Sequence, residues 1–117
     1  MYGNYFTFEE LTSTQTGLYN CPVASSHLGN LACLWDVLNL IRSKLGRPII
    51  INSAFRSPEV NRAVGGVKNS LHMQGRAADI RCAPEYMDEL WSIIQQSDDE
   101  LCLSEKIRKP TFIHIAI

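Results

Sequence analysis

The chain of 117 residues has the length of one domain with one hydrophobic core. Its 11 basic and 12 acidic side chains give a formal net charge of −1, and this balance argues against a protein that binds nucleic acid or an anionic membrane surface. A chain of this length buries about two-thirds of the surface that its unfolded form exposes, so it needs neither a disulfide nor a metal ion to fold. We therefore expect a single globular domain that covers residues 1–117.

The beginning of the chain and its cysteines indicate a protein made in the cytoplasm. No basic segment followed by an apolar segment opens the sequence, so no secretory signal is visible. No apolar run approaches the roughly 20 residues that a membrane-spanning helix needs. The four cysteines are scattered without a CxxC pair: Cys21, Cys33, Cys82 and Cys102. We expect all four to be reduced, with Cys33 buried on an apolar helix.

The first half of the chain predicts helices. Phe8 to Leu11 is typical of a short helical turn that enters a polar loop. Between Gly29 and Leu45, apolar residues recur at steps of three and four, which is the spacing of a helix with one buried face. These residues are Leu31, Leu34, Trp35, Leu38, Ile41 and Leu45. Gly46 and Pro48 favour the end of this helix.

The second half of the chain alternates strands and helices. Apolar runs bounded by polar residues, glycine or proline predict strands at residues 48–53, 77–82, 100–107 and 111–117. Ser57 and Pro58 form a typical helix start, and this helix should stop at Gly65 and Gly66. An amphipathic helix is predicted from Pro84 to Gln96. Helices grouped before a strand-rich end predict an α+β fold with a small antiparallel sheet packed against helices.

Three residues of the second half carry metal-binding side chains: His72, Asp79 and His114. Gly75 permits a tight backbone path between the first two, so a loop with the histidine can lead into a strand with the aspartate. Two imidazoles and one carboxylate are a typical catalytic zinc set, which leaves a fourth position for water. These residues alone favour a plainer interpretation, in which His72 caps a loop and His114 is a hydrogen-bonded core histidine.

The surrounding sequence changes that interpretation. The chain reads S-A-F-R-S-P at residues 53–58, G-G at 65–66 and S-L-H-M-Q-G-R-A-A-D-I at 70–80. This resembles the zinc D-alanyl-D-alanine carboxypeptidase family, whose pattern is S-G-Y-R-S, then V-G-G, then S-x-H-x-x-G-x-A-x-D-I. The resemblance extends weakly to residues 8–11 and 112–115, so it covers nearly the whole chain. Phe55 stands where the family usually has tyrosine.

The resemblance implies a hedgehog/DD-peptidase-like fold and a role for five residues. Zinc would bind to His72, Asp79 and His114. Arg56 would meet a negative oxygen, either the substrate carboxylate or the oxyanion of the tetrahedral intermediate, and its planar guanidinium suits this better than lysine. Ser70 would hydrogen-bond to the bound peptide, which in this family is a peptidoglycan stem peptide.

Zinc peptidases of this kind need a general base, and the positions that relatives use for it are empty here. Many relatives carry the acid three residues before the last histidine ligand, where this chain has Thr111, and others carry a histidine at the position of Phe112. If the last two strands pair about the centre of Lys109–Pro110, Glu105 lies directly opposite His114 and points to the same face. We therefore predict that Glu105 is the general base.

Two alternatives for this carboxylate stay open. Glu105 could be an exposed strand acid beside Lys106 and Arg108. Glu100 is a second candidate for the base, although its even separation from His114 fits the hairpin face less well.

The sequence leads to one principal function and two alternatives. The principal function is zinc-dependent hydrolysis of peptidoglycan stem peptides through a metal-activated water, as a D-Ala-D-Ala carboxypeptidase or an L-Ala-D-Glu endopeptidase. The alternatives are a non-catalytic zinc domain that binds a cell-wall or protein ligand, and a structural domain of a phage or mobile element. We expect cytoplasmic synthesis without a signal peptide, so that the cell wall is reached by release or on a virion. We expect neither nucleic acid nor a membrane as a partner, and the oligomeric state cannot be read from the sequence.

Overall fold

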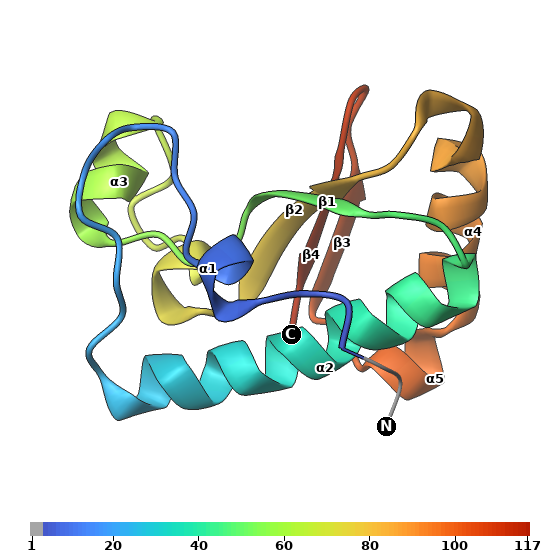
Figure 1. Ribbon diagram of the computed structural model, residues 1–117, viewed down its shortest axis with the longest axis horizontal. Coiled ribbons are helices and arrows are strands. Elements are labelled where there is room, and N and C mark those ends of the chain that lie inside the picture. Colours follow the sequence, from blue (N-terminus) through green and yellow to red (C-terminus); the bar gives the residue numbers. More distant parts are fainter. Residues whose placement is uncertain (1–3) are drawn as a thin grey trace.

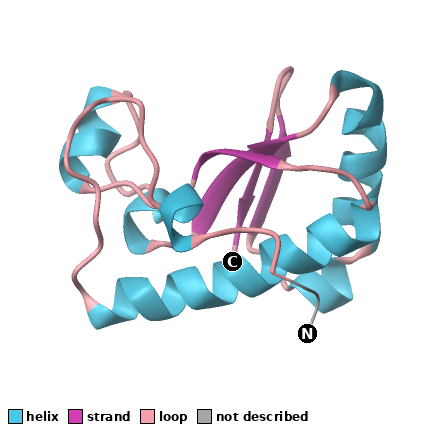
Figure 2. Ribbon diagram, viewed as in Figure 1, coloured by secondary structure: helices cyan, strands magenta, loops and turns pink. Residues whose placement is uncertain are grey.

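The structure, a computed structural model, describes residues 4–117 with the exception of the side chain of Asp98. Its core lies between a four-stranded antiparallel sheet and helix α2 (Ser25–Leu45), which runs along one side of the sheet (Figure 1). Helix α4 (Met87–Gln96) lies at one end of the molecule and α3 (Pro58–Ala63) at the other. The predicted α+β fold, with a small antiparallel sheet packed against helices, is confirmed (Figure 2).

The first two helices begin and end where local chemistry favours it. Helix α1 (Phe8–Leu11) has a capping box, in which Thr7 Oγ1 accepts a hydrogen bond from Glu10 N and the Glu10 carboxylate accepts one from Thr7 N. Helix α2 ends at Gly46, whose φ of 68° provides the predicted left-handed cap. This helix begins at Ser25, before the predicted start at Gly29. The prediction starts too late because the first turn is largely exposed and lacks the apolar spacing that indicates a helix.

The buried face of α2 follows the predicted stripe, with one correction. Its buried apolar residues include Leu31, Leu34, Leu38, Ile41 and Leu45. Cys33 is exposed, so the prediction of a buried thiol at this position is wrong. Neighbouring residues point about 100° apart around a helix, so Leu34 is buried while Cys33 faces solvent. All four cysteines are free thiols, and the buried one is Cys82.

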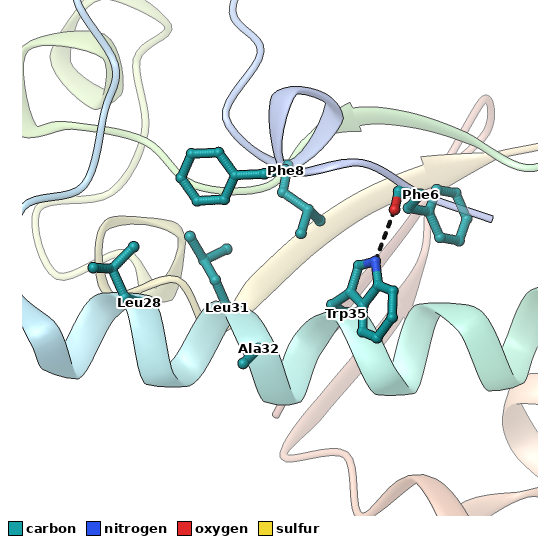
Figure 3. A pocket seen from close by; sticks show the side chains of 7 residues that line it. Phe6, Phe8, Leu28, Leu31, Ala32 and Trp35 are labelled. Carbon is teal, nitrogen blue, oxygen red and sulfur yellow. Dashed lines mark hydrogen bonds between the residues drawn. The ribbon is translucent and has the colours of Figure 1, made fainter. Parts of the chain in front are cut away.

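The N-terminal segment crosses α2 and is tied to it by a tryptophan. Trp35 Nε1 donates a hydrogen bond to Phe6 O at 2.8 Å (Figure 3). An apolar pocket of about 430 Å³ lies beside this contact. It is lined by Phe6, Phe8, Leu11, Leu28, Leu31, Ala32 and Trp35.

The sheet places polar side chains on the face opposite the core. Its strand order is β1-β2-β4-β3, with the bounds Ile50–Ser53, Ala77–Arg81, Ile113–Ala116 and Glu105–Arg108 in that order. Side chains alternate between the two faces of a sheet, and the core face carries Ala78, Ile80, Ile113 and Ile115. Asp79 pairs directly with His114 across β2 and β4. The two side chains therefore share the other face.

The segment before the last hairpin is helical, not extended as predicted. Residues 98–101 form α5 (Asp98–Leu101), so β3 begins at Glu105 and the predicted strand start at Glu100 is wrong. Leu101 is buried in the core, and Cys102 leaves the helix with a φ of 52°. One apolar residue in a short polar segment carries no helical periodicity, so this helix has no recognisable pattern in the sequence.

The register of the last hairpin also differs from the prediction. Lys109 N donates to Phe112 O at 2.9 Å, so the turn is centred between Pro110 and Thr111. This places Pro110 at the second position of the turn, which the fixed φ of proline favours. As a result, Ile107 lies opposite His114, and the predicted pairing of Glu105 with His114 is wrong.

Short helices connect these elements. The α3 helix starts as predicted, with Ser57 Oγ accepting from Val60 N at 3.2 Å and Pro58 in the first turn. A 3₁₀ helix η1 (Leu71–Gln74) precedes β2, and another, η2 (Pro84–Tyr86), leads into α4. Among residues 4–117, no helix has both the length and the apolar character needed to cross a membrane.

Candidate metal centre

The backbone around His72 holds its ring at the face of the sheet. Ser70 Oγ accepts a hydrogen bond from His72 N at 3.2 Å and so caps η1. Gly75 ends η1 with a φ of 74°, and a Cβ there would lie 2.8 Å from His27 O and 3.0 Å from Leu31 Cγ. Only glycine allows this turn to pack against α2, so the predicted role of Gly75 has a physical basis.

The tautomer of His72 follows from its second ring nitrogen. Nδ1 lies 2.7 Å from Ala54 O. A carbonyl oxygen only accepts, so Nδ1 carries a proton, and Nε2 is the ring nitrogen left to contact Asp79 or to bind a metal. Nε2 lies 3.4 Å from Asp79 Oδ1. A histidine that binds a metal usually donates its other N–H to such a fixed acceptor.

Asp79 contacts both histidines through one carboxylate oxygen. Its Oδ1 lies 2.9 Å from His114 Nδ1 and 3.4 Å from His72 Nε2. Burial alone would raise the pKa of the Asp79 carboxyl, but hydrogen bonds with His114 and His72 outweigh burial and hold this pKa well below its usual value. The hydrogen bond to Asp79 raises the pKa of His114. Asp79 therefore stays ionised, which is the form that binds a cation.

The donor set fits zinc. Single ligand atoms of His72, Asp79 and His114 all lie within 4.8 Å of one another, and this is the group of potential metal ligands found among the described residues. Ligand atoms at zinc distances of about 2.0–2.2 Å in a tetrahedral arrangement lie about 3.3–3.6 Å apart, and the two histidine nitrogens lie 2.9 Å and 3.4 Å from Asp79 Oδ1. Two imidazoles and one carboxylate leave a fourth position open, as in catalytic zinc sites. The three predicted ligands are thus brought together from η1, β2 and β4.

Arg56 lies beside this centre and contacts it through Asp79. Its Nη2 is 3.3 Å from Asp79 Oδ2, which is the carboxylate oxygen that the histidines leave free. Its backbone N donates to His72 O at 3.0 Å, so the loop after β1 and η1 are joined next to the metal ligands. Burial lowers the pKa of Arg56, and the negative charge of Asp79 opposes this effect.

Glu105 reaches the centre although its register differs from the prediction. Its Oε1 lies 2.9 Å from His114 Nε2, and its side chain is 46% exposed at the edge of the site. The predicted face is therefore right while the predicted cross-strand partner is wrong, because strand side chains repeat every second residue. Glu100, the second candidate for the base, lies on α5, where it pairs with Lys44 Nζ of α2 at 2.9 Å, and it is not among the residues that line the cleft beside the metal ligands.

An open cleft of about 510 Å³ lies above the metal ligands. Apolar side chains on its walls include the exposed Val64, Val67 and Ile107, and Lys109 also lines it. Ser70 lines it as well, although its hydroxyl is engaged in capping η1. These wall residues were not among the predicted site residues. Strand alternation from Glu105 could have placed Ile107, whereas the others lie on loops that have no period.

Comparison with known proteins assigns this chain to a family. A family profile described as Peptidase M15 matches residues 4–116, so the chain belongs to the peptidase M15 family. The zinc D-Ala-D-Ala carboxypeptidase of Streptomyces albus G is 37% identical to it over 78 residues, which are 64% of this chain and 30% of that protein. The predicted family relationship is confirmed, and the chain spans less than a third of the length of this relative.

Proposed function

We propose that this protein is a zinc-dependent peptidase that hydrolyses peptide bonds of peptidoglycan stem peptides. The observation that carries the proposal is the convergence of His72, Asp79 and His114 at the base of an open cleft. Family membership and the name of the Streptomyces relative support both the metal and the substrate class. Apolar walls beside a charged floor are typical of a site that binds a substrate and orients it with a few polar groups.

The chemistry divides between the metal and the residues around it. When bound, zinc supplies a Lewis acid that polarises a peptide carbonyl and activates water. His72 and Asp79 are held for this task by Ala54 O and by Arg56. The guanidinium of Arg56 lies where it stabilises negative charge that develops beside Asp79, and such preorganised charge is often a large part of catalysis.

Glu105 is proposed to take and return the proton during hydrolysis. Its carboxylate lines the cleft and is half-exposed, so solvent and substrate both reach it. Its contact with His114 Nε2 favours a competing role, in which Glu105 orients a metal ligand. The variant Glu105→Gln separates the two roles. A base predicts a loss of about 10²–10⁴-fold in kcat with zinc retained, and an orienting carboxylate predicts zinc affinity about 10–100-fold weaker.

The bond that is cut can be identified from the products. Mass spectrometry of defined muropeptides incubated with zinc-loaded protein gives the masses of the fragments. Loss of a terminal D-alanine would identify a carboxypeptidase, and cleavage between L-alanine and D-glutamate would identify an endopeptidase. Stoichiometric zinc binding without hydrolysis of any muropeptide would overturn the proposal in favour of a non-catalytic zinc domain, and an absence of zinc binding would favour a structural domain.

A further inference from the structure

The side chain of Asn61 on α3 is buried next to the site and is used by none of the steps above. We propose that Asn61 is a positioning residue, which fixes the Arg56 guanidinium beside the metal centre and couples it to the cleft wall at residues 64–67. The positioning stands on contacts of the described residues. Its effect on catalysis rests on the proposed function.

Arg56 is held by three acceptors that differ in character. Its Nε lies 3.0 Å from Ser53 Oγ, its Nη2 3.3 Å from Asp79 Oδ2 and its Nη1 3.4 Å from Asn61 Oδ1. Asp79 has to share its charge with a bound cation, which weakens its attraction for the guanidinium. Ser53 holds only the Nε side of the planar group. Asn61 is therefore the uncharged acceptor at the Nη1 end of the group, and its contact fixes how the guanidinium is rotated.

The orientation of the Asn61 amide is itself fixed. Asn61 is 4% exposed, and its Nδ2 donates to Val67 O at 2.9 Å. This bond directs Oδ1 toward Arg56, since an amide presents its donor and its acceptor on opposite sides. The backbone adds a further contact, because Gly66 N donates to Asn61 O at 2.9 Å. One side chain thus holds both the catalytic guanidinium and the loop that walls the cleft.

Gly66 is required here for space, not for a special φ angle. A Cβ at this position would overlap the Asn61 amide, lying 2.7 Å from Cγ, and would come within 3.1 Å of Arg56 Nη1. The missing side chain lets the loop close on the amide. Asn61 and Gly66 therefore act as a pair. A methyl group at Gly66 should displace the amide and release Arg56, whereas the same methyl group should do little once the amide is absent.

The test uses zinc-loaded protein and the variants Asn61→Ala, Gly66→Ala and their combination. Each single variant should lower kcat by about 10- to 100-fold with KM little changed, because a misplaced group weakens binding of the transition state more than binding of the substrate. The double variant should match Asn61→Ala within about twofold. Arg62→Ala, an exposed neighbour on α3, is the matched control and should keep the activity of the unchanged protein. Losses of the two single variants that simply multiply in the double variant would overturn the pairing.

The variant Asn61→Asp separates positioning of Arg56 from support of the loop. It keeps an acceptor for Arg56 and loses the donor to Val67 O, so it should retain more than half of the normal kcat. Equal losses for Asn61→Asp and Asn61→Ala would overturn the proposal, since they would mean that only the loop contact matters. Folding and zinc content of each variant are checked by circular dichroism and metal analysis.

A second readout does not depend on activity. The Nη1–H signal of Arg56, assigned with Arg56→Lys, reports in NMR spectra of the zinc-loaded protein how rigidly the guanidinium is held at the nitrogen that contacts Asn61. We expect a single protected signal in the unchanged chain and in Asn61→Asp, and rapid solvent exchange in Asn61→Ala and Gly66→Ala. This pattern in a protein without peptidase activity would refute the proposed function and leave the positioning intact. An unchanged Arg56 signal in Asn61→Ala would refute the positioning whatever the activity.

Discussion

Asn20 joins three backbone segments next to the site, and its removal should destabilise the protein strongly. Asn20 is 7% exposed. Its Nδ2 donates to Thr12 O and to Phe55 O, both at 2.9 Å, and its Oδ1 accepts from Ser57 N at 2.6 Å. These three hydrogen bonds connect the loop before α2 to the end of α1 and to the loop that carries Arg56.

The expected cost of Asn20→Ala follows from these bonds. Each net hydrogen bond contributes about 1 kcal/mol, and a buried backbone group left without a partner costs about 1–3 kcal/mol. Three lost bonds, partly replaced by water that enters the space, therefore lower the free energy of unfolding by about 3 kcal/mol. Urea denaturation followed by circular dichroism measures this change, and the m-value should stay constant because the fold is kept.

Asn52→Ala provides the comparison for this measurement. Asn52 is exposed, and its Oδ1 accepts a single bond from Arg81 Nε at 2.9 Å. Water replaces such a bond readily, so the loss should stay below about 0.5 kcal/mol. If Asn20→Ala cost no more than Asn52→Ala, the view that the buried amide holds these segments together would be refuted.

Three further predictions concern the turn before β2, the thiols and the metal. Gly75→Ala should lower the free energy of unfolding by more than Gly46→Ala in urea titrations, because both positions have positive φ but only a Cβ at Gly75 meets neighbouring atoms. Cys82 should react with a thiol reagent more slowly than the other three cysteines, since it is buried and burial raises the pKa of its thiol. Saturating zinc should raise the melting temperature on the order of 10 °C, and His114→Ala should abolish this rise in calorimetry.

The sequence correctly predicts those helices and strands whose apolar spacing or capping residues lie within the element itself. The apolar spacing of α2, its cap at Gly46 and the start of α3 at Ser57 all lie where propensity and capping rules place them. The pairing of Asp79 with His114 depends on two strands in which each of these polar residues stands between apolar neighbours. Their antiparallel alignment brings the two polar side chains to one face.

Contacts between distant loops could not be predicted in the same way. Asn20 and Asn61 each form hydrogen bonds with backbone groups of other segments. The position of either residue in the sequence does not indicate which backbone groups these are. The exposure of Cys33 shows a related limit. An apolar neighbourhood in the sequence says little about burial, because the angle around the helix decides which side a residue faces.

The last hairpin shows why an error in register left the candidate site intact. Centring the turn on Lys109–Pro110 shifted the predicted pairing by two residues relative to the observed one, in which Pro110 takes the second turn position. A shift of two residues keeps every side chain on its face, so Glu105 still reaches His114 from a diagonal position. A shift of one residue would have turned Glu105 toward the core and Lys106 toward the metal ligands. The polar face of β3 is therefore predicted by its alternation alone, whereas the identity of the residue opposite His114 depends on the turn.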